Sequence, residues 1–158
     1  MKRFLCLALF FWSIHSFSQT TSLMPADRWV DSVFKSLNDE QKIAQLMIMR
    51  VSTIDGSTRK VTFYEKEVSD AILKYNIGGI CLFQGGPLKQ ATLINHFQGI
   101  AQTPLLVSID AENGLGMRMD SVEGLPRQMM MGAVDDPSLI YQYGRVVGEQ
   151  CKRMGIQV

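Results

Sequence analysis

The chain has 158 residues, of which 46% are hydrophobic and 20% are charged, and these proportions are typical of one globular domain with a buried core. Lys and Arg number 16 against 15 Asp and Glu, so the formal net charge is only +1. No basic stripe or basic cluster interleaved with aromatic residues is present in the sequence, and we therefore exclude nucleic acid as a partner.

The first 18 residues have the three parts of a secretory signal peptide. A basic start is followed by an apolar stretch over 4–14 and then by the small residues Ser16 and Ser18. The apolar stretch is shorter than the roughly 20 residues that a membrane-spanning helix needs. A lipid anchor would need a cysteine at the cleavage site, and Cys6 lies too early for that. We expect residues 1–18 to be a signal peptide and the mature protein to be exported, periplasmic or extracellular, without a membrane partner.

Helical spacing of apolar residues predicts the helices. Residues 19–36 are expected to hold a polar leader and a first helix, because apolar residues recur every three or four positions over 27–37. Asn38 followed by Gln41 resembles a capping box, which predicts a second helix over 39–46. Further helices are predicted over 63–75, 88–101 and 137–154.

Short apolar runs between the helices predict a parallel sheet. Strands are expected over 47–51, 77–83 and 104–109, and a fourth is expected to begin at 156. The alternation of strands and helices indicates the α/β class with right-handed crossovers. Residues 52–60 and 111–134 are predicted as loops, the first of them as a wall of a binding site. Natural domains avoid a sheet edge cut after three residues, so we expect this chain to be the front part of a longer protein.

The stretch 104–118 holds the candidate site. Its strand stops at Asp110, and a loop with two glycines then carries Glu112 and Arg118. Ligands of parallel sheets and barrels bind just beyond the carboxyl ends of the strands. Ionised Asp110 can accept hydrogen bonds from hydroxyl groups, and Arg118 offers a rigid fork of donors, so the pair suits a polyol such as a sugar. A second interpretation, in which Asp110 only caps the loop, stays open.

Other chemistries have weaker support. Asp110 and Glu112 would be the paired acids of a glycosidase only if their carboxyl groups were about 5 to 10 Å apart, which a loop after Asp110 does not favour. His96 is the single histidine of the mature chain, and its place within a predicted helix favours a structural role. No spacing typical of a metal site occurs. We expect Cys81 and Cys151 to be buried free thiols rather than a disulfide.

Three blocks of sequence resemble a known family. They are Ile77–Gly86, Pro104–Arg118 and Leu125–Ala133, and their order and spacing resemble the amino-terminal domain of glycoside hydrolase family 3, in particular that of exported bacterial β-N-acetylhexosaminidases. The resemblance extends from about Leu37 to Val158. It implies a TIM-type (β/α)8 barrel, of which residues 37–158 would be the truncated front part with about four strands. It also implies a retaining exo-glycosidase that uses no cofactor and no metal.

The resemblance also assigns the site residues. It implies that Asp110 binds hydroxyl groups of the terminal sugar and that Arg118 helps to hold that sugar, so Asp110 is not the nucleophile. Glu112 is left with a loop-shaping role. The chain departs from the family pattern at Asn113, where the family often has a glycine, and at Leu115, where it often has an arginine.

The catalytic residues are expected beyond Val158. The family's histidine-containing stretch and its nucleophilic aspartate have no match in this sequence, so these 158 residues alone are expected to be inactive. The resemblance implies that the whole protein hydrolyses terminal β-linked N-acetylhexosamine, chiefly N-acetylglucosamine, from glycans. The alternatives are a β-glucosidase of the same family and a non-catalytic secreted fragment that binds sugar.

Overall fold

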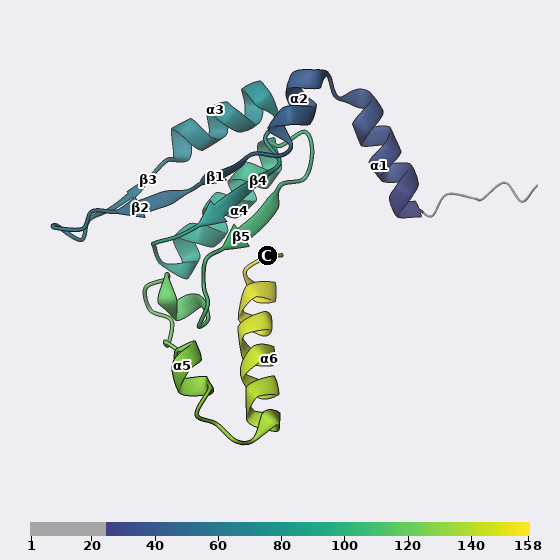
Figure 1. Cartoon of the computed structure of the whole chain (residues 1–158). Coiled ribbons are helices and arrows are strands. Elements are labelled where there is room, and N and C mark those ends of the chain that lie inside the picture. The colour runs from purple at the N-terminus through teal and green to yellow at the C-terminus, as the bar shows by residue number, and fades with distance from the viewer. Residues whose placement is uncertain (1–24) are drawn as a thin grey trace, which may run out of the picture. The chain divides into compact units, whose positions relative to one another are not determined.

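The computed structural model describes residues 25–158, so the predicted signal peptide over 1–18 lies outside the described residues. The chain divides into two compact units, residues 1–32 and residues 33–158. Helix α1 (Pro25–Ser36) crosses from the first unit into the second, and it confirms the helix predicted over 27–37. All other elements belong to the second unit (Figure 1).

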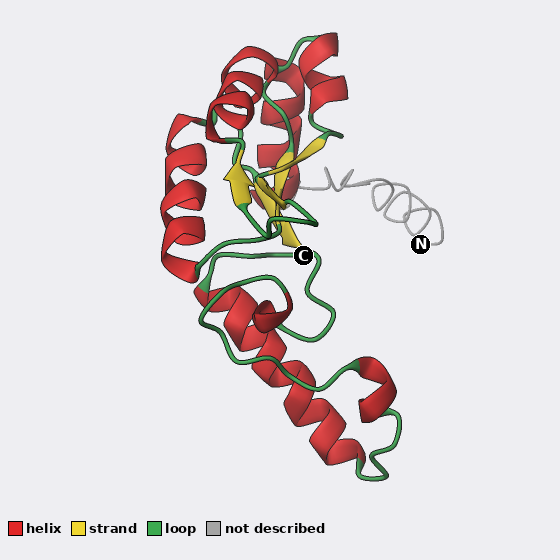
Figure 2. Ribbon diagram, turned by 90° about the vertical axis from the view of Figure 1, so that its left-hand side faces the viewer, coloured by secondary structure: helices red, strands yellow, loops and turns green. Residues whose placement is uncertain are grey.

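A three-stranded parallel sheet organises the second unit. Its strands are β1 (Ile48–Arg50), β4 (Gly79–Leu82) and β5 (Leu106–Ile109), in the order β1-β4-β5. Each lies within a run that the sequence predicts as a strand, and Figures 1 and 2 show the three side by side. All three strands are parallel, so their carboxyl ends lie at one edge of the sheet.

Three helices accompany the sheet. The predicted capping box is confirmed, because the Gln41 amide donates to Asn38 Oδ1 at 2.8 Å and the Asn38 amide donates to Gln41 Oε1 at 3.2 Å. The helix that this box begins is shorter than predicted and ends at Ala44. The helices are α2 (Asp39–Ala44), α3 (Glu65–Tyr75) and α4 (Pro87–Ile100).

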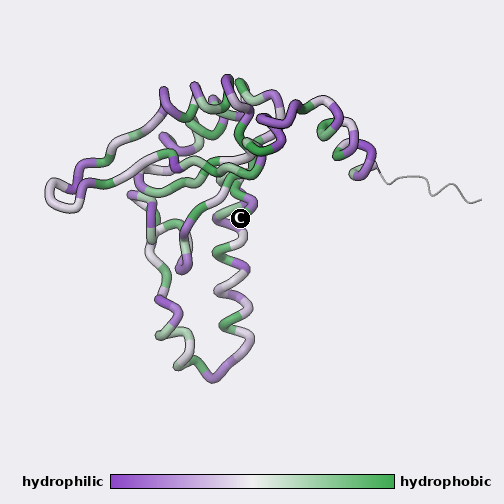
Figure 3. Tube along the Cα trace, turned by 45° about the horizontal axis from the view of Figure 1, so that its top comes forward, coloured by the Kyte–Doolittle hydropathy of each residue, from purple (hydrophilic) through white to green (hydrophobic). Residues whose placement is uncertain are grey.

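The two faces of the sheet differ in burial. Ile80 of β4 and Val107 of β5 are partners in register, and both are completely buried together with Leu82. They share one apolar cluster with residues of α3 and α4, and Figure 3 shows the hydrophobic stretches along the sheet. Side chains alternate along a strand, so Ile48 and Leu106 lie on the opposite face, where they are 51% and 42% exposed. The helices therefore cover one face and leave the other more open.

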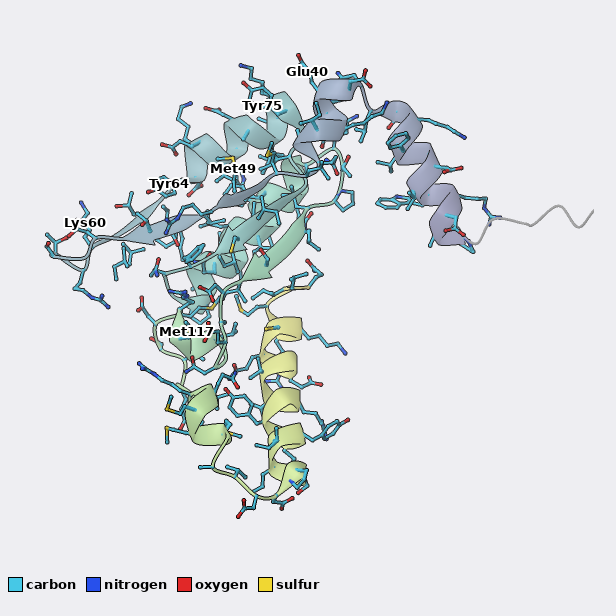
Figure 4. All side chains as sticks on the ribbon, viewed as in Figure 1. Glu40, Met49, Lys60, Tyr64, Tyr75 and Met117 are labelled. Atoms are coloured by element: carbon cyan, nitrogen blue, oxygen red, sulfur yellow. The ribbon has the colours of Figure 1, made fainter. Side chains whose placement is uncertain are left out.

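The loop predicted over 52–60 is wrong for 52–54, which form a strand of an antiparallel hairpin, whereas 55–60 form the turn of that hairpin. Its strands are β2 (Ser52–Ile54) and β3 (Val61–Phe63), both rich in β-branched residues, which favour strands. The turn between them is closed by Asp55, whose carboxylate accepts from the Thr58 amide at 2.6 Å and whose pKa is lowered chiefly by that hydrogen bond. Figure 4 shows Lys60 in this turn, away from the parallel sheet.

The loop predicted over 111–134 contains two short helical segments, a 3-10 turn η1 (Leu115–Met117) and helix α5 (Gln128–Met131). Helix α6 (Pro137–Arg153) follows, and the Asp136 carboxylate caps it by accepting from the Ser138 amide at 2.8 Å. The predicted helix over 137–154 is thus confirmed to within one residue.

The fourth strand predicted from 156 does not form a regular strand, but its residues lie beside β5. The Gln157 amide donates to the Val107 carbonyl at 2.9 Å, and the Ile109 amide donates to the Val158 carbonyl at 2.9 Å. The sheet therefore has three regular parallel strands, not about four. The parallel sheet and its helices confirm the α/β class.

A substitution at Gly78 tests the packing of the segment that leads into β4. A Cβ at this position would lie 1.9 Å from the Gln45 carbonyl oxygen, so main chain would have to move. We expect Gly78→Ala to lower the free energy of unfolding by about 1–3 kcal/mol, measured by urea denaturation.

The matched control is Gly99→Ala in α4, where a Cβ meets nothing within 4 Å. Alanine favours a helix over glycine by roughly 0.5–1 kcal/mol, so this variant should be at least as stable as the parent. Equal stability of the Gly78→Ala and Gly99→Ala proteins would contradict the described packing.

Candidate functional site

Asp110 and Arg118 lie together at the carboxyl end of β5, as the sequence predicts for the site. The Arg118 guanidinium forms an ion pair with the Asp110 carboxylate through Nη2, and its Nε donates to the Asp110 carbonyl at 2.7 Å. The Arg118 side chain is 21% exposed and that of Asp110 is 46% exposed. Both groups are therefore fixed by each other and open to a ligand.

The loop between these residues is folded tightly enough to return Arg118 to the strand end. Gly114 has a φ of 83°, which a side chain would disfavour, and begins the η1 turn. Leu115, where the turn begins, and Met119, two residues after it ends, are each 4% exposed and belong to the apolar core. The Met119 amide donates to the Leu115 carbonyl at 2.8 Å, so Arg118 is carried on a segment anchored at both ends.

Neighbouring segments hold this loop in place. Gln150 of α6 accepts from the Leu115 amide at 3.1 Å through Oε1. On the other side, the Asp120 amide donates at 3.3 Å to the carbonyl of Gly85, which follows β4. Figure 4 labels Met117 in the η1 turn. The position of Arg118 thus depends on contacts with both β4 and α6.

Two site residues were missed by the sequence analysis, Arg50 at the end of β1 and Phe83 just after β4. The Cζ atom of Arg50 lies 4.7 Å from the centroid of the Phe83 ring, and Cζ of Arg118 lies 5.2 Å from the same centroid. Strand parity was the signal that could have found them. With the observed register, alternation puts Arg50, Phe83 and Asp110 on the same, more open face of the sheet.

Ser52, Gln84 and Gln90 form a buried polar cluster that supports the main chain at the carboxyl edge of the sheet. Ser52 is completely buried, and its hydroxyl donates to the Gln84 carbonyl at 2.7 Å and accepts from the Gln84 amide at 3.0 Å. Gln90 of α4 donates to the same carbonyl at 2.7 Å. The hairpin, the end of β4 and the start of α4 are thereby tied together around the main chain of Gln84.

Two hollows adjoin the η1 turn. The first, of about 370 Å³, lies between the hairpin and the turn, and its wall includes Arg59, Gln84 and Arg118. The second, of about 520 Å³, has Glu112 and Arg127 in its wall. Asp110 thus has Arg118 as its ion-pair partner, whereas Glu112 faces another hollow and its carbonyl accepts from Gln128 Nε2 at 2.5 Å. This placement favours the loop-shaping role for Glu112 over that of a paired acid.

The remaining candidates lie outside this site. His96 is an exposed residue of α4 whose Nε2 is 3.2 Å from Ser69 Oγ of α3, which agrees with a structural role. Cys81 and Cys151 are free and partly buried, and burial raises the pKa of the Cys151 thiol. Within residues 25–158, no three His, Cys, Asp or Glu side chains are grouped as a metal site would need. Over the same range, no helix is both long and apolar enough to cross a membrane.

Comparison with known proteins identifies relatives of this fold. Residues 39–158 match the family model described as the glycosyl hydrolase family 3 N-terminal domain. No curated protein sequence matches the chain. Among solved structures, a glycoside hydrolase family 3 β-N-acetylglucosaminidase from Paenibacillus sp. str. FPU-7 is 28% identical with a TM-score of 0.62, over 77% of this chain and 23% of that one.

Two further structures are similar. A fungal multi-domain GH3 β-N-acetylglucosaminidase is 26% identical with a TM-score of 0.57, over 76% of this chain and 14% of that one. A β-glucoside phosphorylase is 20% identical with a TM-score of 0.66, over 82% of this chain and 22% of that one, which shows the fold alone. The present chain spans less than a quarter of the length of each of these proteins.

Removal of the Ser52 hydroxyl tests the buried cluster. Ser52→Ala leaves the Gln84 amide without its acceptor, and an unsatisfied buried donor costs about 1–3 kcal/mol of unfolding free energy. Urea denaturation measures this loss. Thr62→Ala, on an exposed position of β3, is the matched control and should stay within about 0.5 kcal/mol of the parent. A Ser52→Ala protein as stable as the control would show that the buried cluster does not stabilise the carboxyl edge of the sheet.

Proposed function

Because the chain belongs to glycoside hydrolase family 3, we propose that Asp110 and Arg118 bind the terminal sugar of a β-linked glycan. We further propose that the whole protein removes terminal β-linked N-acetylhexosamine, chiefly N-acetylglucosamine, as a retaining exo-glycosidase. The single observation that carries the proposal is the carboxylate–guanidinium pair, partly exposed at the carboxyl end of β5.

The unused hydrogen-bonding capacity of the pair suits a sugar. A carboxylate offers about four acceptor sites and a guanidinium offers five N–H donors. Arg118 uses two groups, Nε and Nη2, on Asp110, so donors remain for a ligand oxygen. Asp110 keeps acceptor sites for hydroxyl groups. Neighbouring hydroxyls of one sugar ring could therefore bind both residues at once, while the ion pair keeps them in place.

The choice of N-acetylglucosamine rests on relatives. The two β-N-acetylglucosaminidases share 28% and 26% identity with this chain, whereas the β-glucoside phosphorylase shares 20%. Glucose is the alternative terminal sugar, since the phosphorylase has the same fold. We assign Asp110 and Arg118 to sugar binding under both alternatives, because both sugars carry ring hydroxyl groups that a carboxylate and a guanidinium can bind.

We assign no catalytic nucleophile and no acid/base group within residues 25–158. In the proposed reaction, an aspartate of the whole protein outside this range attacks the anomeric carbon while the glycosidic bond breaks and an acid group, also outside this range, protonates the departing oxygen. Water then hydrolyses the covalent glycosyl intermediate and releases the sugar and the aspartate. Asp110 and Arg118 hold the sugar during both steps and transfer no proton. We also propose export of the protein, on the signal-like segment over 1–18, and action on glycan outside the cytoplasm.

Hydrolysis assays on the protein purified from its native cells test the activity. We expect cleavage of p-nitrophenyl N-acetyl-β-glucosaminide and much slower cleavage of p-nitrophenyl β-glucoside. The reverse preference would favour the β-glucosidase alternative. Binding of N-acetylglucosamine without cleavage of either substrate would favour a non-catalytic sugar-binding protein.

Substitution of Asp110 tests the site itself. Asp110→Ala removes the acceptor for the sugar hydroxyls, and the loss of a hydrogen bond to a charged group, about 1.5–3 kcal/mol, corresponds to roughly 10- to 100-fold weaker binding of N-acetylglucosamine. Calorimetric titration measures the affinity. Asp135→Ala, at an exposed position before α6, is the control and should bind like the parent. If Asp110→Ala bound the sugar as well as the parent, the assigned site would be wrong.

A further inference from the structure

The Arg118 side chain, besides its bonds to Asp110, lies beside the Phe83 ring. Cζ of Arg118 lies 5.2 Å from the ring centroid, within the range of about 6 Å in which a cation is attracted to an aromatic face. We propose that Phe83 is a positioning residue, whose ring holds the Arg118 guanidinium in the orientation that the sugar site requires. This inference rests on the proposed function of Asp110 and Arg118.

Three attachments fix the guanidinium group. Its Nε donates to the Asp110 carbonyl, its Nη2 pairs with the Asp110 carboxylate, and the Phe83 ring lies beside it. The first two leave the group free to tilt about the line of its bonds to Asp110. The ring opposes that tilt, because the guanidinium cation is attracted to the face of the ring. The guanidinium N–H groups that are not bonded to Asp110 therefore point toward a ligand in one fixed direction.

The backbone beneath the ring is itself fixed. Phe83 follows the last residue of β4, and the next residue, Gln84, is held by the Ser52 hydroxyl through both its amide and its carbonyl. Gln90 adds a third bond to that carbonyl. Phe83 therefore lies between the sheet and a main-chain segment with three hydrogen bonds. A ring anchored in this way provides a rigid platform for a long, flexible side chain.

A second guanidinium, that of Arg50, lies beside the same ring. Arg50 lies 4.7 Å from the same centroid and donates through Nε to the Ser52 carbonyl at 3.0 Å. Two positive groups thus share one ring. An aliphatic side chain of similar size would fill the space but would not attract either cation.

A double-mutant cycle on the full-length protein tests the proposal, with affinity for N-acetylglucosamine measured by calorimetry. Phe83→Leu removes the aromatic face and should weaken binding about 3- to 10-fold, as expected for a cation–π contact. Phe83→Tyr keeps the face and should stay within about twofold of the parent. In an Arg118→Ala background, Phe83→Leu should change the affinity by less than about twofold, because the ring acts through Arg118.

Two outcomes would overturn the proposal. One is an equal loss from Phe83→Leu with and without Arg118, which would mean that the ring contacts the sugar itself or only supports the fold. The other is a loss from Phe83→Tyr as large as that from Phe83→Leu. Thermal melts of all variants show whether each is folded.

A crystal structure of the Phe83→Leu protein separates this proposal from the proposed function. We expect the Arg118 guanidinium to tilt about its bonds to Asp110 in that structure, and an unchanged orientation of the group would contradict the positioning role. If the parent protein bound no N-acetylglucosamine, the proposed sugar site would fail, while this structural result would still decide whether Phe83 positions Arg118.

Discussion

The parallel pairing of β4 with β5 is the interaction on which the candidate site depends. Its register sets Leu82 opposite Ile109, so the next residues, Phe83 and Asp110, leave the sheet side by side. Burial of Ile80 and Val107 against the helices fixes this register, because a slip of one residue would move these apolar side chains to the opposite face. The same packing that stabilises the core therefore positions the polar groups at the edge.

Much of this arrangement could be predicted from the sequence, and the reasons are local. Asp110 ends an apolar run, and Asn38 and Asp136 have the side chains that cap helices. Asp110 and Arg118 were expected near one another because both follow the same strand end. The physical basis of their meeting lies in Gly114 and in the buried side chains of Leu115 and Met119, which bring the loop back to the strand.

The parts that the sequence did not reveal depend on contacts between distant segments. Strand β2 could not be distinguished from a loop because it has only three residues, too few to show periodicity. Alternation along each strand could have put Arg50 and Phe83 on the more open face, but their contact also requires the register of β1 with β4, which a local sequence pattern does not give. At 156–158 the chain does pair with β5, yet without the geometry of a regular strand.

The central claim is that the edge formed by β4, β5 and the η1 turn binds a terminal sugar. The most direct measurement is a crystal structure of the protein with N-acetylglucosamine bound. The account predicts sugar hydroxyls within hydrogen-bond distance of the Asp110 carboxylate and the Arg118 guanidinium, with Arg118 still stacked on Phe83. A sugar bound at another place, with the Asp110–Arg118 pair untouched, would contradict it.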